Sequence, residues 1–215
     1  MHFSGLFALL AIVPAALCAP PGPGHSSSVS HSIASTQSVQ PTHPAPPPIR
    51  VLTGSIAVKT ASNKFLGYLS FDTHSIHGFV PRKPKEVVVS FNPRSEPFAL
   101  DIVRSGRPTK FYVGGAGFNP LKRASANIVP LDVVPLTPPF SGPVPPIGAE
   151  STIWSLDFGD NELTAQWVNR GGQKPQTFIA FDPKRNQLFF TGDIRAYNQK
   201  FRTKAELVRF FFVKK

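Results

Sequence analysis

The sequence predicts an all-β domain, folded as an antiparallel β-sandwich or barrel with one short helix. From residue 51 onward, short runs rich in Val, Ile, Phe and Thr alternate with clusters of turn-forming residues, as in proteins of many short strands. A β-trefoil is the alternative, although no internal repeat is visible. The runs cover residues 51–59, 64–71, 86–92, 98–104, 109–113, 128–134, 152–158, 162–168, 176–181, 187–191 and 206–213.

The N-terminal region predicts secretion. Residues 3–17, FSGLFALLAIVPAAL, form an apolar run that is too short to span a bilayer and is followed by small residues, as in a signal peptide. We expect cleavage after Cys18, so that residues 1–18 are removed and the protein is extracellular. Cys18 is the only cysteine, and the mature chain therefore has no disulfide.

Residues 19–49 have the composition of a disordered leader. They consist mainly of Pro, Ser and Thr, and the first 49 residues contain no Lys, Arg, Asp or Glu. Such a segment has too little apolar surface to form a core and is a candidate for O-glycosylation. The folded part is therefore expected to be a single domain of residues 50–215.

A second Pro-rich stretch, residues 130–148, lies inside this domain. It is expected to be a long loop rather than a linker, because each flank alone would supply few strands. The one helical pattern follows at residues 193–202. Asp193 is its expected N-cap, and Ile194, Tyr197 and Phe201 fall on one face.

Residues 151–169, STIWSLDFGDNELTAQWVN, predict a hairpin with one apolar and one polar face. A tight turn centred on Asp160 and Asn161 separates the two faces without exception. Two tryptophans then oppose each other in the core; the alternative is an exposed sugar-binding platform. The expected pairs are Phe158 with Leu163, Leu156 with Ala165, and Trp154 with Trp167.

The charge balance favours anionic partners. The chain has 23 Lys and Arg against 12 Asp and Glu, a formal net charge of +11, and all of these residues follow position 49. For a secreted protein, an anionic polysaccharide or the cell-wall surface is the expected partner, and nucleic acid is less favoured. The expected contacts come from loops that carry Arg82, Lys83, Lys85, Arg170, Lys174, Lys184 and Arg185.

No catalytic, metal-binding or cofactor motif is complete, so no cofactor is predicted. Asp72, His74 and His77 in the segment FDTHSIH are weak candidates for acid–base catalysis. Lys122 and Arg123 form a dibasic pair that would suit a processing protease.

Three segments resemble a family of small secreted proteins from mushroom-forming fungi, the basidiomycetes. They are GSIAVKTASNKFLGYLS (54–70), ESTIWSLDFGDNELTAQWVN (150–169) and LFFTGDIRAYNQKF (188–201). These segments resemble the LGY, IWSxD…LTxQWVN and LTGD motifs of that family, and the last motif reads FTGD in this chain. No activity is established for that family, so the resemblance implies an extracellular fungal setting and one continuous domain but no functional residue. This chain is more basic than the pattern, and residues 72–85 depart from it.

The sequence therefore favours a non-enzymatic, basic β-domain that binds anionic or carbohydrate surfaces. One alternative is a secreted hydrolase of polysaccharide or RNA that uses Asp72, His74 or His77. The other is a structural protein of the cell wall, displayed on the Pro/Ser/Thr-rich leader.

Overall fold

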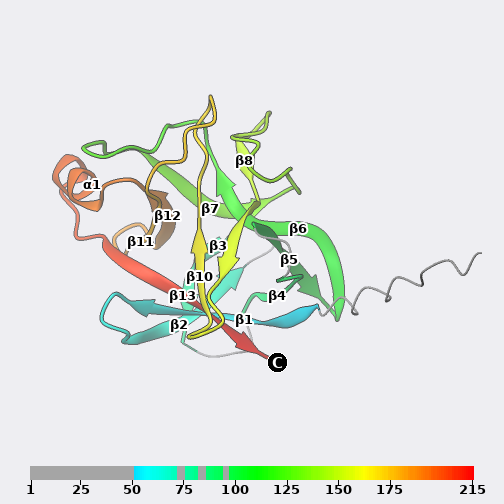
Figure 1. The fold of residues 1–215 in the computed structure, drawn as a ribbon. Coiled ribbons are helices and arrows are strands. Elements are labelled where there is room, and N and C mark those ends of the chain that lie inside the picture. The colour runs from blue at the N-terminus through cyan, green and yellow to red at the C-terminus, as the bar shows by residue number, and fades with distance from the viewer. Residues whose placement is uncertain (1–50, 72–75, 82–85, 94–96) are drawn as a thin grey trace, which may run out of the picture. The chain divides into compact units, whose positions relative to one another are not determined.

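The computed structural model describes residues 51–71, 76–81, 86–93 and 97–215 (Figure 1). The predicted signal peptide and leader lie outside the described residues. The strands are β1 (Leu52–Thr60), β2 (Phe65–Phe71), β3 (Ile76–Val80), β4 (Val88–Phe91), β5 (Phe98–Arg104), β6 (Arg107–Ala116), β7 (Ile128–Val134), β8 (Ala149–Glu150), β9 (Thr152–Leu156), β10 (Glu162–Ala165), β11 (Phe178–Asp182), β12 (Gln187–Thr191) and β13 (Glu206–Lys214), with helix α1 (Ile194–Phe201) before β13.

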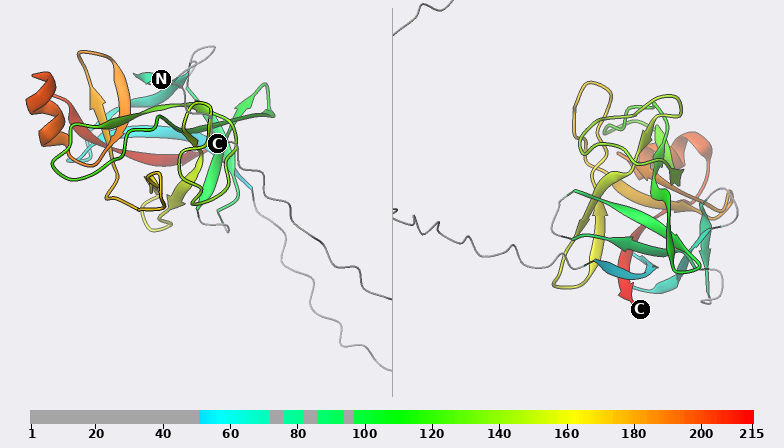
Figure 2. Two further views of the ribbon diagram at one scale, coloured as in Figure 1. Left: turned by 90° about the horizontal axis from the view of Figure 1, so that it is seen from above. Right: turned by 90° about the vertical axis from the view of Figure 1, so that its right-hand side faces the viewer.

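The strands form a closed antiparallel barrel, which confirms the predicted fold class. An eight-stranded ring runs through β1, β4, β5, β6, β7, β12, β11 and β13. A smaller ring of six strands runs through β1, β4, β5, β9, β10 and β13, because β9 and β6 share one edge of β5 while β10 and β11 share one edge of β13. Figure 2 shows from two further sides that the last strand, β13 (red), lies beside the first strand, β1 (cyan), with which it pairs.

The pairings repeat three times along the chain. In each repeat the first and last strands pair within the six-stranded ring, as β1–β4, β5–β9 and β10–β13. The middle strands form the hairpins β2–β3, β6–β7 and β11–β12. The hairpins meet, because β7 pairs with β12 and β3 contacts both. This is the arrangement of a β-trefoil, the alternative that the sequence left open.

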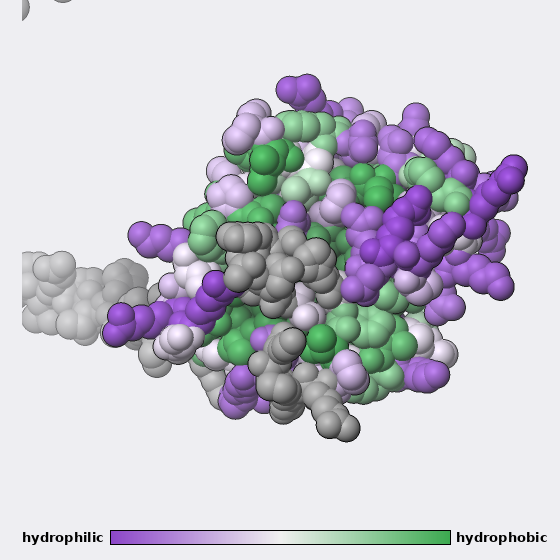
Figure 3. All heavy atoms as spheres, turned by 180° about the vertical axis from the view of Figure 1, so that it is seen from behind, coloured by the Kyte–Doolittle hydropathy of each residue, from purple (hydrophilic) through white to green (hydrophobic). Residues whose placement is uncertain are grey.

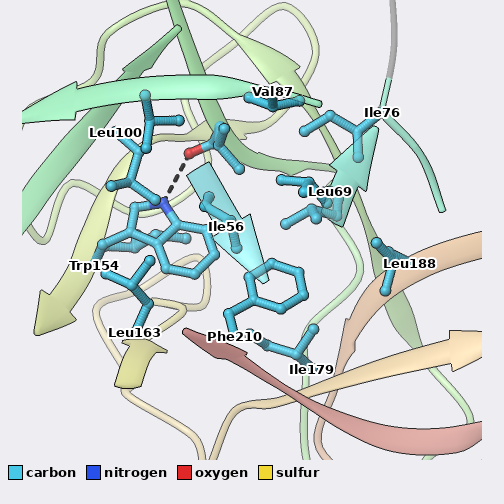
Figure 4. Packing of buried hydrophobic residues seen from close by; sticks show 14 of the residues in the cluster. Ile56, Leu69, Ile76, Val87, Leu100, Trp154, Leu163, Ile179, Leu188 and Phe210 are labelled. Carbon is cyan, nitrogen blue, oxygen red and sulfur yellow. Dashed lines mark hydrogen bonds between the residues drawn. The ribbon is translucent and has the colours of Figure 1, made fainter. Parts of the chain in front are cut away.

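The barrel is filled by one cluster of apolar side chains from all three repeats (Figure 4). Trp154 is fully buried, donates its indole N–H to the carbonyl of Val113 at 2.8 Å, and stacks on Phe210 with ring centres 6.0 Å apart. Trp167 is also fully buried, against Phe190. The prediction of two core tryptophans is confirmed, and neither is an exposed sugar platform.

The predicted register of the hairpin is wrong by two residues. Leu163 pairs with Leu156, and Trp154 faces Ala165 rather than Trp167. The turn is longer than expected because the Asp157 and Asp160 carboxylates accept backbone N–H groups inside it, at 2.7 and 2.9 Å. A shift of two keeps each side chain on its face, but Phe158 moves into the turn and is 67% exposed.

Helix α1 begins as predicted. The Asp193 carboxylate accepts the backbone N–H groups of Arg195 and Ala196 at 2.9 and 3.0 Å, which satisfies donors that the first helical turn leaves free. Tyr197 lies in a second, smaller apolar cluster beneath the helix, together with Phe189. Arg202 ends the helix in the left-handed conformation.

Candidate functional site

The structure describes no side-chain positions for the three candidate catalytic residues. Asp72 and His74 lie outside the described residues, and His77 is described only as a residue of β3. Arg82, Lys83 and Lys85, expected to bind anions, also lie outside. Within the described ranges, no three His, Cys, Asp or Glu side chains come together as ligands for a metal ion.

Arg170 and Lys174 belong to one tight turn that follows Trp167 and Val168. The Asn169 N–H donates to the carbonyl of Gln173 at 2.7 Å, and the Gly172 N–H donates to the carbonyl of Asn169 at 2.9 Å. The turn therefore presents two exposed cations from a backbone that is closed on itself.

Each of these cations lies over an exposed phenylalanine from a different loop. The Lys174 ammonium is 3.5 Å from the ring centre of Phe140, and the Arg170 guanidinium carbon is 5.8 Å from that of Phe118. Phe140 is 48% and Phe118 is 43% exposed. We call these four residues, Phe118, Phe140, Arg170 and Lys174, the loop platform.

Backbone contacts hold the three loops of the platform together at the upper end of Figure 1. The Gly117 N–H donates to the carbonyl of Gly148 at 3.0 Å. A β-carbon added to Gly142 would lie 3.4 Å from the carbonyl oxygen of Asn169, so this loop packs closely on the next. The side chain of Asn169 in turn bonds both backbone groups of Leu121, each at 2.8 Å.

The backbone conformation of Phe140 is energetically unfavourable for a phenylalanine. Its φ angle is 57°, in the left-handed region that bulky side chains avoid. The exposed ring gains little from burial to offset this cost. Such strained positions concentrate at functional sites, and neither local backbone preference nor core packing accounts for a phenylalanine here.

Glu150 is bonded to Val168, two residues before the platform residue Arg170, and it is buried with no ion pair among the described residues. Only 1% of it is exposed, one carboxylate oxygen accepts the Val168 N–H at 3.0 Å, and the other has no partner among the described residues. Burial raises the pKa of Glu150 to about 8, although the Val168 N–H favours the ionised form. The sequence offers no signal for this, because the burial depends on loops distant in the chain.

Arg185 has a structural partner that the sequence did not reveal. Its guanidinium donates to the Asp182 carboxylate at 2.9 Å and to the Tyr197 hydroxyl at 2.8 Å. Asp182 is fully buried; burial alone would raise its pKa, but hydrogen bonds from Tyr197, Thr203 and Arg185 outweigh it and lower the pKa. Lys184 is exposed in the same β11–β12 turn.

The dibasic pair lies in an exposed loop whose backbone is tied on both sides. Asn169 holds Leu121 just before Lys122, and the Asp193 carboxylate accepts the Ala124 N–H just after Arg123, at 3.0 Å. A processing protease needs an extended segment, so this loop would have to detach before cleavage.

A groove of about 330 Å³ lies where β10 and β11 separate over β13. Its lining is mainly apolar, and at one end the Arg209 guanidinium is bonded to the Glu162 carboxylate. In the first two repeats the corresponding strands pair with each other, as β1–β2 and β5–β6. The groove marks where the third repeat departs from the other two.

In the part of the chain that the structure describes, no helix has the length and apolar character to cross a membrane. No protein-family model, curated protein or solved structure matches this chain.

Proposed function

We propose that this protein is a secreted, non-catalytic binding protein that attaches to anionic carbohydrate surfaces, such as an acidic cell-wall polysaccharide, through the loop platform. The observation that carries the proposal is the exposed ring of Phe140, which lies beneath the Lys174 ammonium on a backbone with a φ angle of 57°. An aromatic ring offers a flat apolar face to a sugar ring, and the adjoining cations attract carboxylate groups. The formal charge of +11 strengthens this attraction at a distance.

Retention on insoluble polysaccharides at rising salt tests the proposal. We expect the protein to bind a uronic-acid polymer at low salt and to elute as salt screens the charges. A neutral polysaccharide with sugar rings of the same size should retain the protein less than the uronic-acid polymer does. If no polysaccharide retains the protein at low salt, the proposal is wrong.

A matched pair of variants places the site. Phe140→Ala with Lys174→Gln removes one ring and one charge from the platform. Phe158→Ala with Lys110→Gln removes the same groups from exposed positions in the β9–β10 and β5–β6 hairpins. The platform variant should lose about tenfold or more in affinity, since truncating an aromatic anchor commonly costs 1 to 2 kcal/mol. Equal losses in both variants would mean that charge and apolarity act without a site.

A further inference from the structure

Helix α1 lies between two loops that are far apart in the sequence. The loop of residues 121–127 faces it across an open groove of about 650 Å³, which is lined by Lys122, Asn127, Gln199, Lys200 and their neighbours. The β11–β12 turn contacts the helix through Arg185, whose guanidinium bonds the Tyr197 hydroxyl. The fold therefore brings the two Lys–Arg pairs of the sequence, at 122–123 and 184–185, to the same helix.

The groove is held in shape before any ligand arrives. The Asp193 carboxylate caps α1 and also accepts the Ala124 N–H, so one side chain fixes both walls. Gly192 allows the loop to approach, because a β-carbon there would lie 2.8 Å from the backbone nitrogen and oxygen of Lys122. Ligand binding would therefore not include an entropy cost for ordering these walls.

Eight exposed cations surround α1, and we call them the helix patch. The segments 121–127, 183–186 and 194–205, which supply them, contain no Asp or Glu. Two of the acids that flank these segments are already engaged, since Asp182 is fully buried under Arg185 and Asp193 is bonded to three backbone N–H groups. Glu206, which follows the last segment, is an exposed acid at the start of β13. The patch consists of Lys122, Arg123, Lys184, Arg185, Arg195, Lys200, Arg202 and Lys204.

Figure 3 views the molecule from behind and shows hydrophilic residues gathered on the side where α1 lies. Helix stability does not explain this charge. A cation in the last turn, such as Lys200, interacts favourably with the helix dipole, but Arg195 lies in the first turn, where a carboxylate would be favoured, and that turn holds none.

Phe201, the exposed aromatic ring beside the patch, already packs against the Tyr197 ring, with ring centres 4.8 Å apart, and also contacts two cations. The Arg185 guanidinium carbon and the Lys200 ammonium lie 5.0 and 5.4 Å from the ring centre of Phe201. Proteins that bind single-stranded nucleic acid stack bases on free aromatic rings. The patch therefore favours recognition of closely spaced anionic groups over base stacking.

We propose that the groove beside α1 is a second binding site, which takes a polysaccharide bearing sulfate or phosphate ester groups. Successive ester groups lie between the loop cation Lys122 and the helix cation Lys200, with the other cations of the helix patch extending the track. This site does not depend on the loop platform, because it recognises charge at close spacing and uses no free aromatic face.

The test is binding of dextran sulfate, with uncharged dextran as the reference ligand, measured by calorimetry across a salt series. Lys122→Gln with Lys200→Gln removes two charges from the groove, and Arg107→Gln with Lys110→Gln removes two exposed charges from the β5–β6 hairpin. We expect the groove variant to lose at least tenfold in affinity at 150 mM salt and to lower the salt slope by about 1.5, following counterion release. The hairpin variant should change affinity by less than threefold.

Three outcomes would overturn the proposal. One is equal loss in the two variants, and another is no loss in the groove variant. The third is tighter binding of a DNA duplex of matched charge than of dextran sulfate. Thermal melting of each variant checks folding. The Phe140→Ala, Lys174→Gln variant should lose more affinity than the groove variant for the uronic-acid polymer, and less for dextran sulfate, so that failure of one site is told apart from failure of the other.

Discussion

At the scale of single residues, Glu150 ties stability to pH. Its pKa in the folded protein is raised to about 8 from an ordinary value of 4.5. Between these two values the unfolded chain has lost the proton that the folded chain still holds. Stability therefore falls as pH rises through this window, by up to about 1.4 kcal/mol per pH unit.

Glu150→Gln removes this dependence, since an amide keeps the acceptor for the Val168 N–H and does not ionise. We expect the variant to match the parent at pH 5 and to exceed its unfolding free energy by about 3 kcal/mol at pH 8. Denaturant unfolding at the two pH values measures the difference. Glu206→Gln, at an exposed acid, is the control; an equal gain at pH 8 in both variants would contradict the assignment to Glu150.

Single-residue roles were the part of the site that the sequence predicted least well. As a cation in a turn, Arg185 was expected to bind anions. Its guanidinium instead bonds Asp182 and Tyr197, and only the folded chain brings Tyr197 to this position. The sequence contained no indication that Phe140 belongs to a site, because the inference depends on its backbone φ angle and on the Lys174 ammonium over its ring.

At the scale of elements, the hairpin of residues 151–169 was predicted better than its turn. Alternation placed Trp154 and Trp167 on the core side, and both are fully buried. The pairing moved by two residues because the Asp157 and Asp160 carboxylates stabilise a longer turn. Alternation determines the face of a side chain, whereas the turn sets the register, and turn length is the weaker signal.

The loop of residues 121–127 supports a prediction about processing. Its backbone is bonded by Asn169 before the dibasic pair and by Asp193 after it, so the folded protein should resist cleavage at Lys122 and Arg123. Limited trypsin digestion followed by intact-mass measurement tests this. We expect Asn169→Ala, which frees Leu121, to be cut there at least fivefold faster than the parent. Rapid cleavage of the parent at this pair would show that the ties do not protect the loop.

At the scale of the whole molecule, the sequence predicted the class of fold but not its threefold arrangement. The three repeats share strand pairings rather than residues, so no repeat is visible along the chain. The same closure assembles both proposed sites. Phe118, Phe140 and Arg170 come from three separate loops, and their meeting depends on contacts such as Gly117 with Gly148 and Asn169 with Leu121. Sequence spacing gives no measure of these distances.

The most direct test of the loop platform is hydrogen–deuterium exchange of the protein with and without a uronic-acid polymer at low salt. We expect slower exchange on binding in residues 117–121, 138–148 and 169–175, because the ligand covers the loops that carry Phe118, Phe140, Arg170 and Lys174. The hairpin turn at 157–161 should be unchanged. Binding that leaves the three loops unprotected, or that protects the 157–161 turn instead, would contradict the central claim.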